Sequence, residues 1–136
     1  RSVLFERYAK ALNLALYEMP ELKSIEPQAL RNAMVLHSPE KLWSTATDFV
    51  GWVPEALLNL DDQIAAGQPT QGLCLELIRN CNLLGARHME RLATMVCRLD
   101  EPEFQEQRRG FVRELEMEFT NVVRELHRYR DSRARL

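Results

Sequence analysis

The stretch Gln71–Leu99, QGLCLELIRNCNLLGARHMERLATMVCRL, decides the fold that the sequence predicts. Placed at 100° per residue, its apolar side chains fall within an arc of about 160°. A face this wide contacts several neighbours, so we expect one long, central, buried helix in which Gly85 allows another helix to approach closely. The arc comprises Leu73, Cys74, Leu77, Ile78, Cys81, Leu84, Gly85, His88, Met89, Leu92, Met95, Val96 and Leu99.

Start and stop signals divide the remaining sequence into further helices. Ser38, followed by Pro39 and Glu40, is the clearest start, because it combines a capping side chain, an initial proline and an early acidic residue. Pro54 is expected to break or kink a helix, since the residue before a proline disfavours the α conformation. The expected helices are Val3–Met19, capped by Ser2, then Pro27–Leu36, Pro39 to Gly51 or Trp52, Pro54–Ala66, and a last helix from near Glu101, capped by Asp100, to Tyr129 or beyond.

These segments predict an all-α fold in a single domain spanning residues 1–136. None of them alternates apolar and polar residues with the period of a strand. We expect a bundle of five to six helices, in which the last two form a long antiparallel hairpin and the shorter N-terminal helices pack on it. The chain begins without an initiator Met, so it is interpreted as a domain excised from a longer protein or as a trimmed chain.

The composition excludes several classes of protein. Apolar residues make up 46% and charged residues 28%, the balance of an ordinary globular domain, and the net charge of −2 favours no polyanionic partner. No apolar run approaches the roughly 18–20 residues of a membrane span, and no signal peptide is visible. Three cysteines without a CxxC pair do not suggest a disulfide framework, so we expect the cytoplasm or delivery into another reducing compartment.

Cys74, Cys81 and His88 are spaced by seven residues and lie on one stripe of the expected helix. Seven helical residues advance about 10.5 Å, whereas Zn–S and Zn–N bonds measure about 2.0–2.3 Å, so no two members of the row share an ion. We therefore expect no metal and no cofactor, and interpret the cysteines as small core residues and His88 as a buried, hydrogen-bonded histidine. One alternative is that Cys97, on the polar side of the helix, senses the redox state. The other is that protonation of His88 near neutral pH controls the packing of an interface.

Aromatic residues gather near Pro54 in the sequence. The main expectation is that Trp43, Phe49 and Trp52 belong to the core. The alternative is that, together with His88, they line an apolar ligand pocket, because interrupted helices in all-α proteins line such cavities. Trp43 and Trp52 are nine residues apart and point to opposite sides of a helix, so one of them is a candidate surface anchor for a partner.

Arginines accumulate at the end of the last helix, which opens with acidic residues. The helix dipole alone favours this gradient. The alternative is an anion-binding or nucleic-acid-binding tail, although Tyr129 is the one aromatic residue there for base stacking. The candidate anion-binding residues are Arg124, Arg128, Arg130, Arg133 and Arg135.

No motif indicates catalysis: the sequence lacks a Gly-rich phosphate loop, GxSxG, HExxH and Glu-x-x-His. We therefore expect a non-enzymatic helical domain that binds another protein, or itself, in a regulatory or adaptor role, as many bacterial helical bundles do. The alternatives are a sensor that binds an apolar small molecule and a nucleic-acid accessory domain. The candidate partner contacts are apolar residues that lie off the core faces, namely Leu75, Leu83, Cys97, Trp43, Trp52 and Met117.

Overall fold

Five α-helices and one 3₁₀ turn make up residues 22–134, the part of the chain that the structure, a computed structural model, describes. No strand occurs within this range, so the all-α prediction is confirmed for these residues. The expected helix Val3–Met19 and its cap Ser2 lie outside the described residues. The elements are α2 (Pro27–Leu36), α3 (Pro39–Ala65), α4 (Gln71–Leu84), α5 (Arg87–Arg98), η1 (Pro102–Phe104) and α6 (Gln105–Ala134).

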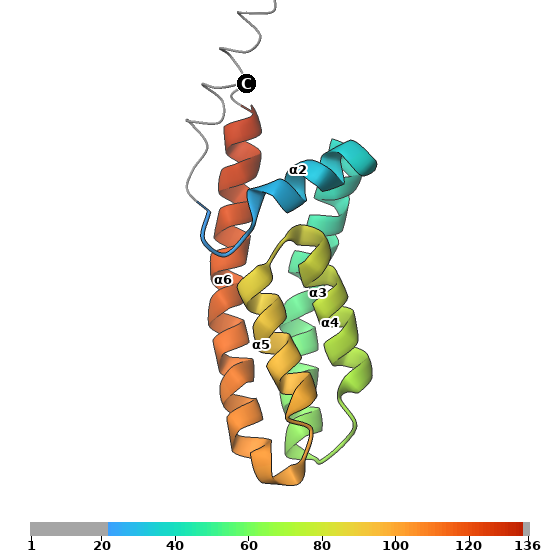
Figure 1. Ribbon diagram of the computed structural model, residues 1–136, viewed down its shortest axis with the longest axis vertical. Coiled ribbons are helices and arrows are strands. Elements are labelled where there is room, and N and C mark those ends of the chain that lie inside the picture. Colours follow the sequence, from blue (N-terminus) through green and yellow to red (C-terminus); the bar gives the residue numbers. More distant parts are fainter. Residues whose placement is uncertain (1–21, 135–136) are drawn as a thin grey trace, which may run out of the picture.

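Four of these helices, α3 to α6, run alternately up and down, while α2 lies across one end of the bundle (Figure 1). Each of the first three packs against the helix that follows it in the chain, and α6 packs against α3, so the four close into a ring. The short helix α2 packs on α3 and α4.

The predicted single helix over Gln71–Leu99 is wrong, because the chain reverses direction at Gly85. Gly85 caps α4 in the left-handed conformation, with φ +73° and ψ 20°, which a residue without Cβ adopts at little cost. The N–H groups of Gly85 and Ala86 donate to carbonyl groups near the end of α4. Two successive hairpins, α4–α5 and α5–α6, therefore replace the expected long hairpin.

Gly85 also permits the close approach of a second helix, as the sequence predicted, and that helix is α2. A Cβ atom built on Gly85 would lie 2.6 Å from the Cβ atom of Ala29 and 2.9 Å from the carbonyl oxygen of Glu26. The Glu26 N–H donates to the Gly85 carbonyl oxygen at 2.9 Å. The same glycine thus makes the reversal and gives α2 its place against α4.

Of the break or kink predicted at Pro54, the break is wrong, since α3 continues through the proline as one helix of 27 residues. An internal proline removes one backbone hydrogen bond and costs a helix about 3 kcal/mol. Val53, Ala56 and Leu57 surround the proline in sequence and are at most 2% exposed in the core. Their packing keeps the helix continuous where local preference alone favours a break.

Of the remaining helix signals, those for α2 and for Ser38 are correct, and the one for Asp100 is wrong. The bounds of α2 are those predicted, and the Ser38 side chain caps α3 by accepting a hydrogen bond from the Lys41 N–H at 3.0 Å. The predicted cap at Asp100 does not form. The chain instead tightens into the 3₁₀ turn η1, which begins with Pro102 and follows an extended Glu101, and α6 starts after this turn.

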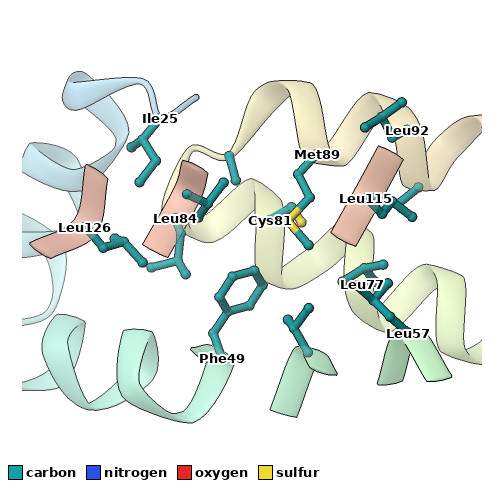
Figure 2. Close-up of a cluster of buried hydrophobic side chains, with 14 of the residues drawn as sticks. Ile25, Phe49, Leu57, Leu77, Cys81, Leu84, Met89, Leu92, Leu115 and Leu126 are labelled. Carbon is teal, nitrogen blue, oxygen red and sulfur yellow. The ribbon is translucent and has the colours of Figure 1, made fainter. Parts of the chain in front are cut away.

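Side chains from the four long helices meet in one core (Figure 2). Phe49 of α3 and Cys81 of α4 are at most 2% exposed, and Met89 of α5 and Leu115 of α6 are fully buried. Ile25, which precedes α2, closes the same core at the end near Leu84. The core thus continues from the ring of four helices to the segment that leads into α2.

A buried carboxylate ties this segment to α6. Glu125 is 7% exposed, and each of its carboxylate oxygens accepts from the Ser24 N–H at 2.9 Å. One of them also accepts from the Ile25 N–H at 3.0 Å. Glu118, seven residues earlier in α6, accepts a bond from the Ser24 hydroxyl group at 3.1 Å. These bonds hold the chain against α6 directly before α2 begins.

Candidate interaction groove

A groove between α3 and α6 has a mainly apolar lining and contains one of the predicted site residues, Trp43. Its volume is about 160 Å³. Ala46, Val50, Val123 and Leu126 give it an apolar lining, and Trp43 lies with them. The remaining lining residues are Thr47, His127 and Arg130.

Trp43 and Arg130 form a positively charged part of the groove. The guanidinium carbon of Arg130 lies 5.6 Å from the centroid of the Trp43 ring, a cation–π arrangement. Trp43 also contacts Tyr129, with ring centroids 6.1 Å apart. Because His127 adds a second basic side chain and no carboxylate of the described residues lines this groove, it suits an apolar ligand that carries negative charge.

The structure does not bring the four candidate pocket residues together. Phe49 is 2% exposed and packs edge-on against Phe119 at 6.0 Å, so it belongs to the core. Trp52 is half-buried against the same core. His88 is exposed on α5, and its predicted burial is wrong because the reversal at Gly85 changes the direction in which residues beyond it point. Of the four, Trp43 alone lines the α3–α6 groove.

The other predicted partner contacts are spread over three helices. Leu75 and Leu83 of α4 are 46% and 39% exposed, Met117 of α6 is 71% exposed, and Cys97 of α5 is half-buried.

Two exposed apolar residues at the end of α2 were not among the predicted contacts. They are Val35 and Leu36, which are 85% and 76% exposed. The sequence could have identified them as exposed, because their helical positions lie off the side of α2 that carries Leu30 and Ala33.

The candidate anion-binding arginines also separate. Arg124 and Arg128 line one hollow on α6 together with Lys23, and Glu125 lies in that hollow as well. Arg130 lies over Trp43 in the groove instead. The side chain of Arg133 and the whole of Arg135 lie outside the described residues.

Two of the cysteines are buried in surroundings that disfavour their thiolate form. Burial raises the pKa of Cys81 to about 12 and that of Cys74 to about 11, where the adjacent Cys97 thiol adds to the shift. Thiols with such pKa values are protonated at neutral pH and are poor nucleophiles. Within residues 22–134, no group of three potential metal-binding side chains comes together.

We predict that only one of the three thiols reacts rapidly with a disulfide reagent such as DTNB at pH 8 in the native protein. Cys97 is the half-buried one, whereas Cys74 and Cys81 are fully buried and protonated. The measurement is the number of thiols that react before and after unfolding in guanidinium. Cys97→Ser should remove the fast reaction, and three equally fast thiols would contradict the burial of the other two.

Compared with protein-family models, curated proteins and solved structures, the chain matches none. No helix in the described part of the chain has both the length and the apolar character needed to cross a membrane. Function is therefore inferred from the surface of the fold itself.

Proposed function

We propose that this protein is a non-enzymatic interaction domain that binds an amphipathic helix of another protein in the groove between α3 and α6. The observation that carries the proposal is the groove's apolar lining, bordered by Trp43 and Arg130. Tryptophan and arginine are among the residue types most enriched among side chains that dominate binding energy at protein interfaces. A groove between two helices accepts the apolar side of a third helix.

The size of the groove favours a protein partner over a small apolar ligand. Pockets for drug-sized molecules have volumes of about 300–1,000 Å³. The groove, at about 160 Å³, is smaller and open. It suits a few side chains projecting from a partner helix, and Arg130 and His127 favour a partner with a carboxylate beside its apolar residues.

The proposal is tested with a displayed library of amphipathic helical peptides that carry an acidic residue beside the apolar side. In a Trp52→Phe background, Trp43 is the one remaining tryptophan, so its emission reports occupation of the groove directly. We expect selected peptides to shift this emission. Thr47→Arg, an exposed change in the groove, should weaken binding about tenfold or more, equivalent to roughly 1.4 kcal/mol or above.

The matched control is Leu58→Arg, which places the same side chain at an exposed position on α3 that does not line the groove. It should leave peptide binding unchanged. Equal binding by both variants would exclude the groove as the site. Light scattering at several concentrations adds a second outcome: a mass that rises with concentration, and does so less in Thr47→Arg, would make a second copy of this chain the occupant.

A further inference from the structure

At the end of the bundle away from α2, the connection between α3 and α4 lies beside the connection between α5 and α6 (Figure 1). A second pocket is lined by residues of both connections. Its volume is about 330 Å³. Thr70 and Gln71 line it from the start of α4, Asp100 and Glu101 from the connection before α6, and Arg108 from α6 itself. It shares no residue with the α3–α6 groove.

Arg108 is a buried cation without a counter-charge among the described residues. It is 7% exposed, its Nε–H donates to the carbonyl oxygen of Val96 at 3.0 Å, and its Nη2 donates to the Thr70 hydroxyl oxygen. Both acceptors are neutral, and no carboxylate oxygen of residues 22–134 lies within 4 Å of the guanidinium. Of the five N–H donors of an arginine, three therefore have no acceptor within the described chain. Nη1 of Arg108 is not among the fully buried atoms that lack a partner, so its N–H groups reach the open pocket, where an anion could accept from them.

The start of α4 adds further donors at the same place. The Thr70 hydroxyl group is used by Arg108 and does not cap the helix, and no acidic residue occupies the first turn. The first N–H of this helix to find an intrahelical acceptor belongs to Cys74, which donates to the Thr70 carbonyl. The preceding N–H groups carry the positive end of the helix dipole, an arrangement that binds anions elsewhere.

We propose that this pocket binds an oxyanion of the phosphate type, either free or as a group on a larger molecule. Arg108 supplies the charge, and the N–H groups at the start of α4 supply further hydrogen bonds. Asp100 and Glu101 are both exposed, and their carboxylates make no hydrogen bond or ion pair that the structure describes. They oppose binding by charge repulsion, so neutralising them should strengthen it.

The experiment measures thermal unfolding and calorimetric binding with inorganic phosphate, against sodium chloride at equal ionic strength. We expect the unfolding temperature to rise with phosphate and not with chloride, because a ligand that binds only the folded state stabilises it. Gln71→Glu puts a carboxylate at the start of α4 and should weaken phosphate binding about tenfold or more while the protein stays folded. The control is Thr120→Glu, an exposed site 12 residues beyond Arg108 on α6, which should bind phosphate as the parent does.

Two further variants separate an anion site from a purely structural arginine. The double variant Asp100→Asn/Glu101→Gln should bind phosphate several-fold more tightly, and Arg108→Gln should lose the phosphate response. Unfolding of the double variant would instead identify these carboxylates as the counter-charge of Arg108 and overturn the proposal. An identical response to chloride, or phosphate binding that Gln71→Glu leaves intact, would do the same. Comparison of inorganic phosphate with phenyl phosphate distinguishes a free anion from a group on a larger molecule.

Discussion

Replacing Gly85 by alanine is expected to lower the free energy of unfolding by about 2–4 kcal/mol. The left-handed conformation costs a residue with a Cβ atom about 1–2 kcal/mol, and the added atom would lie 2.6 Å from the Ala29 Cβ and 2.9 Å from the Glu26 carbonyl oxygen. Relief of these contacts requires α2 to move away from α4, and crowding of this kind costs about 1–3 kcal/mol. Urea unfolding followed by circular dichroism measures the change.

Two other glycines separate the cost of the left-handed conformation from the cost of the contact with α2. Gly67 also has a positive φ, +68°, but nothing lies within 4 Å of the place that its Cβ would take, so Gly67→Ala should cost only the conformational part, about 1–2 kcal/mol. Gly51 lies within α3 in open space, and Gly51→Ala should stabilise the protein by about 0.5–1 kcal/mol. Equal losses for Gly85→Ala and Gly67→Ala would show that the contact with α2 adds nothing to stability.

Replacing Glu125 by alanine is the second large effect that we expect, a loss of about 2–4 kcal/mol in the free energy of unfolding. The change leaves the Ser24 and Ile25 N–H groups, which are buried, without their acceptor. Each buried group without a partner costs about 1–3 kcal/mol. Denaturant unfolding measures the total, and hydrogen exchange at these two amides locates the effect.

The size of the loss should depend on the acceptor. Glu125→Gln keeps one oxygen and should fall between the parent and Glu125→Ala. Glu114→Ala removes an exposed glutamate from the same helix and should change stability by less than about 0.5 kcal/mol. A Glu125→Ala protein as stable as the Glu114→Ala control would show that water replaces the carboxylate at no cost.

Helix content was predictable from the sequence because apolar spacing and local capping are encoded within a few neighbouring residues. α2 has its predicted bounds, and Ser38 caps α3 as expected. One helix was expected to continue at Gly85 and another to stop near Pro54, and both expectations were wrong for the same reason. Glycine and proline can each end a helix, but tertiary packing decides whether they do. Gly85 ends α4 in a left-handed conformation and leaves α2 the space that a Cβ would take, whereas Pro54 is held in α3 by buried neighbours on both sides.

The candidate sites were less predictable, because they depend on which helices become neighbours. Trp43 was identified from the sequence, but its partner Arg130 is 87 residues away and was only a candidate member of an anion-binding tail. Glutamates 118 and 125 and Arg108 have the sequence signature of solvated helix residues, and only the fold shows them buried. No local pattern distinguishes a charged residue on the solvent side of a helix from one that faces a neighbouring backbone.

The reversal at Gly85 has a consequence for how the chain folds. It makes α4, α5 and α6 neighbours of the helices next to them in sequence, so each of these pairings closes only a short loop. The pairing of α3 with α6 joins the most distant segments of the ring and carries the largest loop-closure entropy. A partner that binds the groove between α3 and α6 in the folded state alone would span this pairing and stabilise it against opening.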